Sequence, residues 1–286
     1  MRSGREIAAE KFFLLSTVVS GSITVAIFGF MFFMALPLLS GGKILHILTG
    51  SWSPVDGSFG ILPMIVSTLA ISFLSIVISF PMSIGCSSFI AELGPRRLSR
   101  YLKKIVQVMT GIPTVIYGFV GIFLLVPVVR EAAGGGSGMS VLTAAIMLSV
   151  LISPTMILFF NDSFERVPAS YLTAAEGLGA SSVQKLLYVI LPNARKGIFV
   201  GLILAFGRAL GDTLVALMIA GNSAQVPGSV LDSARTMTAH IALVIAADYE
   251  SLEFKSIFAC GMVLYLFTTM IVVSVRYFTF GRGSGR

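Results

Sequence analysis

Residues 197–222 read GIFVGLILAFGRALGDTLVALMIAGN, an apolar run long enough to cross a bilayer that carries two charges near its middle. Five other stretches contain no Asp, Glu, Lys or Arg, and each can supply the ~20 apolar residues of a membrane-spanning helix. These uncharged stretches are 12–42, 57–91, 105–129, 132–161 and 256–275. Hydrophobic residues make up 56% of the chain and charged residues only 12%, and the mean hydropathy is +0.94. The sequence therefore predicts an all-α membrane protein with six transmembrane helices, and it excludes an ordinary soluble domain.

The chain is expected to form a single transmembrane domain over residues 1–286, without a separate soluble domain of useful size. The expected spans are about 12–39, 61–90, 105–129, 141–160, 198–221 and 256–280. Residues 161–197 form the longest connection between spans on the expected cytoplasmic side. The first apolar run is too long for a signal-peptide core and lacks a cleavage pattern, so we expect it to be an uncleaved anchor.

The distribution of Lys and Arg predicts the orientation of the spans, because short cytoplasmic loops collect these residues. With the N-terminus inside, the inner side holds Arg2, Arg5, Lys11, Arg96, Arg97, Arg100, Lys103, Lys104, Arg166, Lys185, Arg195, Lys196, Arg276, Arg282 and Arg286. The outer side keeps only Lys43, Arg130, Arg235 and Lys255. Both termini are therefore expected in the cytoplasm. The pI of about 9.6 then reflects topology and contact with the lipid bilayer, and no nucleic-acid partner is expected.

The two charges in the opening run, Arg208 and Asp212, lie four residues apart, so on a continuous helix they share a face and can pair. A charge at the bilayer centre costs about 3 kcal/mol on insertion scales. One interpretation is a neutral pair that only fixes helix packing. The other is a polar substrate pathway, because a guanidinium offers forked donors that match an oxyanion. On the second interpretation Thr213 and Asn222 are further candidates to line the path.

The segment PASYLTAAEGLGASSVQKLLYVILPNARKG, residues 168–197, predicts a short helix, a glycine turn and a second helix under the membrane. Pro168 suits the first turn of a helix, and Gly177 and Gly179 suit its end. Ser181 or Ser182 can cap the second helix, which Pro192 is expected to close before the next span. Such a shape can insert into a groove on a soluble partner, although an ordinary connector would have the same periodicity.

Other candidate chemistry is weak. The stretch GGSG at residues 135–138 contains the G-x-S-G pattern of some intramembrane proteases, with His240 as the conceivable base, but Ser137 lies in a glycine-rich linker outside the spans. His46 and His240 have no metal-ligand spacing, and the two cysteines, Cys86 and Cys260, are expected to pack in or beside spans. No metal site is expected. No G-x-x-x-x-G-K-[ST] motif occurs, so ATP is expected to bind only to partner subunits.

The segment 168–197 also resembles the cytoplasmic loop of ABC-importer permeases, E-A-A-x-x-x-G-x9-I-x-L-P. The matching positions are Ala174, Ala175, Gly179, Val189, Leu191 and Pro192, with Thr173 where the family usually has Glu. Further stretches, SFGILPMIVSTL, ELGPRRLSRYLKK, GIPTVIYGFVG, GRALGDTLVALMIAGN and ARTMTAHIA, resemble the C-type permeases of bacterial phosphate-uptake ABC transporters. That family often has Glu at the position of Asp212.

The resemblance implies an ABC-importer type I permease fold in a prokaryotic plasma membrane. It implies a subunit of an ATP-driven phosphate importer that forms half of the translocation pathway. The implied partners are a homologous second permease, two cytoplasmic ATP-binding subunits that use ATP and Mg²⁺, and an external phosphate-binding protein. Docking on the ATPases is implied for Thr173, Ala174, Ala175, Glu176, Gly179, Leu191 and Pro192. The alternatives are a permease for sulfate, molybdate or tungstate, an ion-gradient-driven carrier, and a component that only signals phosphate supply.

Overall fold

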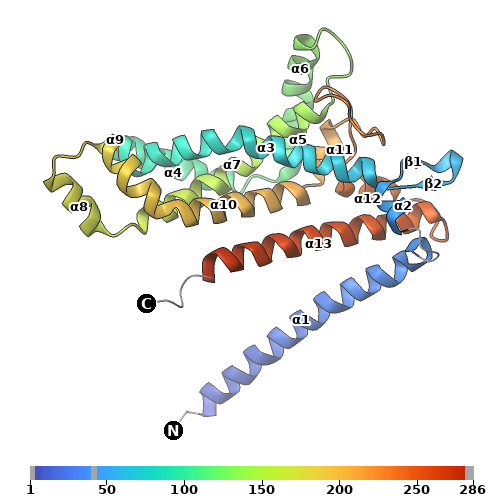
Figure 1. Ribbon diagram of the computed structural model, residues 1–286, viewed down its shortest axis with the longest axis horizontal. Helices are drawn as coiled ribbons and strands as arrows, with labels where there is room; N and C mark the ends of the chain where they lie inside the picture. The colour runs from blue at the N-terminus through green and yellow to red at the C-terminus, as the bar shows by residue number, and fades with distance from the viewer. Residues whose placement is uncertain (1–3, 40–43, 281–286) are drawn as a thin grey trace.

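The computed structural model describes residues 4–39 and 44–280, and within them six helical stretches are long and apolar enough to cross a membrane. These stretches are Ala9–Leu36, Leu62–Leu93, Thr114–Ala132, Val141–Glu165, Ser182–Gly211 and Leu252–Tyr277. The prediction of an all-α protein with six membrane-length helices is confirmed. Figure 1 shows most of them as a bundle whose long axis runs across the view.

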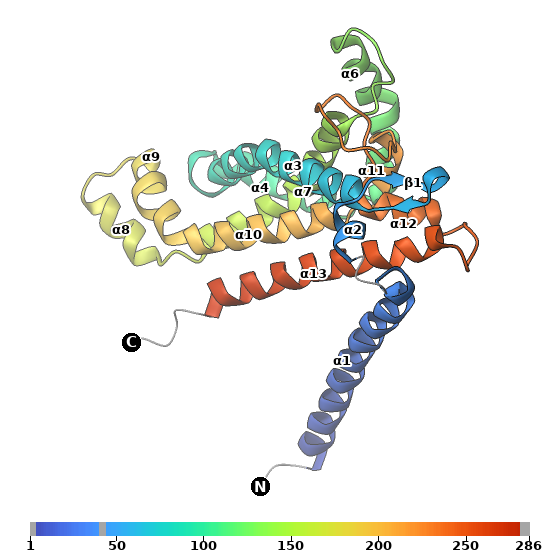
Figure 2. The same ribbon diagram turned by 45° about the vertical axis from the view of Figure 1, so that its right-hand side comes forward.

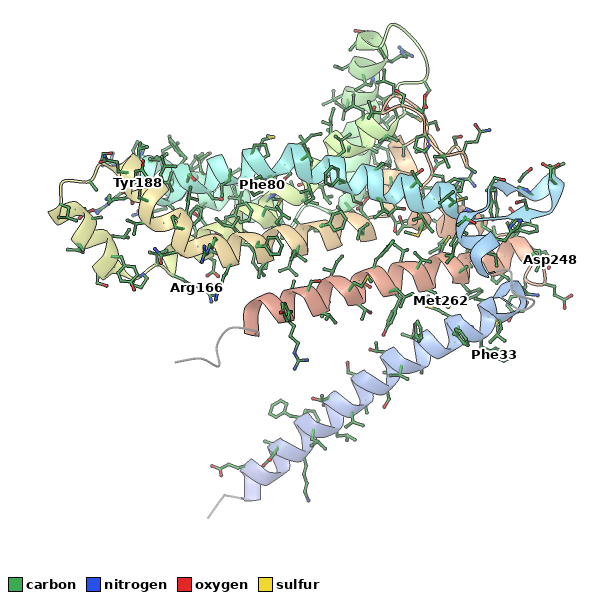
Figure 3. All side chains as sticks on the ribbon, viewed as in Figure 1. Phe33, Phe80, Arg166, Tyr188, Asp248 and Met262 are labelled. Carbon is green, nitrogen blue, oxygen red and sulfur yellow. The ribbon has the colours of Figure 1, made fainter. Side chains whose placement is uncertain are left out.

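The centre of the bundle is formed by α3 (Leu62–Ser88), α7 (Val141–Glu165) and α10 (Leu191–Gly211), which pack along one another. A buried row of serines on α3 faces α7, because residues four apart share one side of a helix. The row consists of Ser75, Ser79, Ser83 and Ser87. Its small side chains let the two backbones approach closely, and the Ser87 hydroxyl donates to the carbonyl of Ile157 at 3.2 Å. Phe80, labelled in Figure 3, reaches from α3 to the ring of Phe160 on α7.

The first helix stands apart from this centre. α1 (Gly4–Leu39) packs along α13 (Leu252–Phe280) only over its later turns, and Figures 1 and 2 both show its beginning diverging from the bundle. The contact includes Phe28 against Tyr265 and Phe30 against Phe258. Most of the other apolar side chains of α1 are exposed, as expected for a helix surrounded by lipid on several sides.

The expected third span, 105–129, is not one continuous helix. α4 (Arg96–Met109) starts well before it and ends at Met109, and the chain turns before α5 (Thr114–Val120) begins. The π-helix η3 (Gly121–Leu125) and α6 (Val126–Ala132) then continue the segment away from the bundle axis (Figure 1). The break lies at Pro113, because a proline disfavours the helical conformation of the residue before it.

Pro192 does not close the second helix of the 168–197 segment, so that expectation was wrong. α9 (Ser182–Lys185), the π-helix η4 (Leu186–Ile190) and α10 form one helical rod that continues through Pro192 to Gly211. Pro192 lies in the first turn of α10, directly after the π-helical turn, where the hydrogen-bond ladder is already changed.

The end of the bundle opposite to α8 (Ala169–Gly177) carries several short elements (Figure 1). They are α2 (Ile44–Thr49), β1 (Trp52–Ser53), η1 (Pro54–Asp56), β2 (Ser58–Phe59), α11 (Leu214–Ile219) and α12 (Met237–Val244). β1 and β2 pair antiparallel, with Trp52 opposite Phe59. α3 continues at its other end into the π-helix η2 (Phe89–Leu93).

Candidate functional site

The opening run of the sequence is divided in the structure by a break between α10 and α11. α10 ends at Gly211, and Asp212 has an extended backbone with φ −71° and ψ 131°. The Asp212 carboxylate accepts a hydrogen bond from the backbone N–H of Val215 at 3.0 Å, in the first turn of α11. An aspartate in this position satisfies an otherwise unpaired N–H at a helix start. The expected single span over 198–221 is therefore two helices joined at Asp212 and Thr213.

The break changes the relation between the two charges. Arg208 and Asp212 no longer occupy successive turns of one helix, and within the part of the chain that the structure describes no ion pair joins them. The exposed Arg208 instead donates from Nη1 to the hydroxyl of Thr155 on α7 at 2.8 Å. The expected pairing of Arg208 with Asp212 was wrong, because the Asp212 carboxylate caps α11 instead.

Both residues nevertheless line the same cavity, which has a volume of about 380 Å³. Its lining residues are Thr114, Leu151, Arg208, Gly211, Asp212, Thr213 and Leu214. Thr213 is thus placed beside the two charged residues, and α5, α7, α10 and α11 all contribute to the wall. The lining combines a cation, a carboxylate and two hydroxyls with apolar side chains, and such polar groups in a pocket can orient a small ligand.

Asn222 does not line this cavity. It follows α11 at the far end of that helix with φ 63°, and its side chain donates to the carbonyl of Leu217 at 2.7 Å. Its own carbonyl accepts from Nε of Arg235 at 3.0 Å, and its N–H donates to the carbonyl of Ala234. These bonds give Asn222 a place in the turn that ends α11. α11, which is six residues or about 1.7 turns long, lies between Asn222 and Asp212.

Three threonines around the cavity were not expected from the sequence. Thr114 lines the wall of the cavity. Thr155 accepts the hydrogen bond from Arg208. Thr238 of α12 donates to the backbone carbonyl of Asp212 at 2.7 Å and so ties the break to α12. The available signal was a hydroxyl inside an apolar stretch, but serine and threonine are frequent in this chain. Only the packing of the helices shows which hydroxyls face the site.

The 168–197 segment has the predicted shape. α8 is followed by Gly179 with φ +78°, and Ser181 caps α9 in a capping box with Gln184. The helix–turn–helix prediction is confirmed, and α8 forms the extreme end of the molecule in Figure 1. Thr173, Ala174, Glu176 and Gly179 are exposed there, Ala175 is half-buried, and the Thr173 hydroxyl bonds back to the carbonyl of Ala169. Leu191 and Pro192 lie apart from the tip, at the start of α10.

His240 has a structural setting that differs from that of a catalytic base. Its side chain is fully buried, its Nε2 lies 3.0 Å from the hydroxyl of Ser256, and its ring packs edge-on against Trp52. Ser137, the other residue of the weighed protease pattern, bonds instead to the backbone of Met139. The structure therefore does not bring the residues of that pattern into one site.

The buried imidazole predicts an acid-sensitive fold. α12 lies outside the six membrane-length helices, and burial, followed by the charge of Arg235, lowers the pKa of His240 from 6.5 to about 4. Between about pH 4 and pH 6.5 the unfolded chain binds a proton at His240 that the folded chain does not bind. The contribution of His240 to stability is therefore fully present above about pH 6.5 and is lost as the pH falls toward 4. We expect this group to lower the free energy of unfolding by about 3 kcal/mol across that window.

Thermal unfolding of the detergent-solubilised protein at a series of pH values measures this effect. The variant His240→Gln keeps a hydrogen-bonding side chain beside Ser256 but has no proton to take up in this range, so its stability should depend much less on pH. An equal acid-induced loss in both proteins would assign the effect to other groups.

Known proteins resemble this chain in sequence and in overall fold. Residues 83–281 match the family described as "Binding-protein-dependent transport system inner membrane component". The chain is 30% identical over 264 residues to the "Probable ABC transporter permease protein YqgH" of Bacillus subtilis. The matched region covers 91% of this chain and 85% of that protein. It is also 30% identical over 283 residues to the "Phosphate transport system permease protein PstC" of Mesorhizobium japonicum, covering 92% of this chain and 85% of that protein.

Two solved structures share the fold. A chain of a "bacterial ABC transporter involved in the import of the acidic polysaccharide alginate" superposes with a TM-score of 0.65 at 14% identity and covers 99% of this chain and 100% of its own length. A chain of the "MetNI methionine ABC transporter" in an inward-facing conformation gives a TM-score of 0.58 at 18% identity, covering 76% of this chain and 95% of that chain.

Proposed function

This chain belongs to the family of binding-protein-dependent transport system inner membrane components, and from that premise we propose that it is the C-type permease subunit of an ATP-driven phosphate importer. Its fold is that of the ABC-importer type I permeases. Relatives named PstC support phosphate as the cargo. The chain would form half of the translocation pathway, and a homologous second permease would form the other half.

The position of Arg208 carries this proposal. Arg208 lies on a membrane-length helix, and its exposed guanidinium lines the cavity. Among the described residues it makes a single side-chain hydrogen bond, to Thr155. Contact of this cation with hydrocarbon would cost about 3 kcal/mol, so the cavity is expected to hold water or an anion instead. A guanidinium has five N–H donors in a planar fork, which leaves several of them for the oxygens of a phosphate.

Asp212 is expected to limit how tightly the anion is held. Its carboxylate lies at the same cavity, where it balances the charge of Arg208 when no substrate is present. The bond from Val215 occupies only part of its acceptor capacity. The carboxylate can therefore also accept a hydrogen bond from the hydroxyl of a protonated phosphate. A fully ionised sulfate has no such donor. This gives a physical basis for preferring phosphate among oxyanions.

ATP would act through partner subunits that dock on the segment around α8. The tip of that segment exposes two large apolar side chains, Leu178 and Tyr171, which suit insertion into a groove of an ATP-binding subunit. From Ser182 the helical rod runs without interruption to Gly211, so a displacement at α8 can move Arg208 and the cavity wall. ATP and Mg²⁺ would bind in the ATPases, and closure of the two ATPases would switch the pathway between outward and inward access.

The proposed location is the prokaryotic inner membrane, with α8 on the cytoplasmic side. α1 begins and α13 ends toward that side of the molecule (Figure 1), in agreement with the excess of Lys and Arg expected there. The opposite end, with β1, β2 and α12, would receive the external phosphate-binding protein. A solved relative of this fold has been described in complex with its substrate-bound periplasmic protein, which supports such an arrangement.

Uptake by reconstituted vesicles tests the proposal. The chain is assembled with its partner permease, the ATPases and the binding protein, and entry of radiolabelled phosphate is measured with and without ATP. We expect ATP-dependent uptake that excess sulfate, molybdate or tungstate does not inhibit. Inhibition by one of these anions would reassign the cargo. Uptake driven by an ion gradient in the absence of the ATPases would overturn the ABC-importer mechanism.

A further inference from the structure

A lysine joins the segment around α8 to the end of α3. The Nζ of Lys185, on α9, lies 2.6 Å from a carboxylate oxygen of Glu176 on α8 and 2.6 Å from a carboxylate oxygen of Glu92 on η2. α9 and η2 are in contact, although they are far apart in the sequence. One ammonium group thus connects three elements: the exposed helix α8, the start of the rod that leads to α10, and the end of α3.

The two ion pairs differ in burial. The side chains of Lys185 and Glu92 are 11% and 14% exposed, whereas that of Glu176 is 57% exposed. Exposed ion pairs contribute little net stability, while breaking a shielded pair leaves a charge without compensation. Both partners of the pair between Lys185 and Glu92 are therefore shielded from solvent, whereas the pair between Lys185 and Glu176 reaches the exposed surface of α8.

The surroundings hold Lys185 in place. The capping box fixes the start of α9, with the Gln184 side chain accepting from the Ser181 N–H at 2.8 Å. Both contacting helices contain a π-helical turn next to the pair, η2 with Glu92 and η4 directly after Lys185. The three charged groups line a cavity of about 650 Å³ together with Arg96 and Arg100, which add two further positive charges to its wall.

We propose that Lys185 is a positioning residue that passes the displacement of α8 sideways to α3, in addition to the path along α10. α3 packs along α7, and α7 carries Thr155, the partner of Arg208. Movement of α8 would then reach both walls of the cavity together. Without the bridge, α10 would move while α3 and α7 followed incompletely. This inference rests on the proposed function, because it assigns a role in the same transport cycle.

The measurement is the amount of anion imported per ATP hydrolysed by the complete reconstituted complex. We expect Lys185→Gln to lower this ratio about fivefold or more while ATP hydrolysis continues. Fivefold is about the smallest effect typical of energetic coupling between two sites. The double variant Lys185→Gln with Glu92→Gln leaves no uncompensated shielded charge, and it should assemble normally. If the two residues act through one bridge, it should show the same ratio as the single variant.

Lys196→Gln is the matched control, because it removes a positive charge from an exposed site on the same rod and should leave the ratio unchanged. An unchanged ratio in the double variant would overturn the inference. Should Lys185→Gln fail to assemble, the double variant still decides the question. The ratio is measured with whichever anion the wild-type complex imports, so an error in the proposed cargo would leave this comparison intact.

Discussion

Replacing Arg208 by alanine is expected to lower phosphate uptake roughly a hundredfold, because hydrogen bonds to a charged group are each worth about 1.5–3 kcal/mol and an anion would lose at least one of them. The substitution also leaves Asp212 as the remaining charge at the cavity, which would repel the anion. Uptake of labelled phosphate by reconstituted vesicles measures the effect. Co-purification of the variant with its partner subunits shows whether the membrane assembly is intact.

Two further variants separate the parts of this prediction. Arg208→Lys keeps the charge but loses the planar fork, and it should retain an intermediate rate of uptake. Thr155→Val removes only the hydroxyl that orients the guanidinium, so its loss should be smaller than that of the alanine variant. Normal uptake by an assembled Arg208→Ala complex would show that Arg208 is not part of the pathway. It would also contradict the assignment of the polar cavity to that pathway.

Replacing Gly179 by valine should uncouple ATP hydrolysis from uptake. Gly179 adopts φ +78°, and its N–H donates to the carbonyl of Glu176 at 2.9 Å, which ends α8. A β-branched residue in this left-handed conformation is strained by at least about 1–2 kcal/mol, so the turn is expected to rearrange and α8 to change its direction. The ratio of imported phosphate to hydrolysed ATP should fall severalfold, while hydrolysis by the ATPases persists.

The neighbouring glycine provides the control. Among the described residues, no atom beyond the adjoining backbone would lie within 4 Å of a Cβ at Gly177 or Gly179, so packing opposes neither substitution, but only Gly179 has a positive φ. Gly177→Ala should therefore leave coupling unchanged. Gly179→Asn should recover part of the lost coupling, because asparagine tolerates the left-handed region. Equal coupling in Gly179→Val and the wild type would show that the direction of α8 does not matter for transmission.

The interrupted opening run shows why the sequence predicted some features and not others. Gly211 and Asp212 are residues that end and start helices, and Asp212 lies three positions before Val215, as a capping residue should. The apolar residues on both sides favoured one continuous span, and hydrophobicity outweighed these weaker signals. In the 168–197 segment, by contrast, the glycine turn and the Ser181 cap had no hydrophobic pattern to oppose them, and they were predicted correctly.

The sequence by itself determined the membrane class, the number of membrane-length helices and the helix–turn–helix around Gly179. These features follow from hydrophobicity over about 20 residues and from turn chemistry, which act within one segment of chain. Only the tertiary structure decided that Arg208 bonds to Thr155, that Asp212 caps α11, and that Lys185 lies between Glu92 and Glu176. The physical reason is that a charged side chain binds whichever polar group packing brings within reach, and that partner is set by how helices distant in the sequence lie against one another.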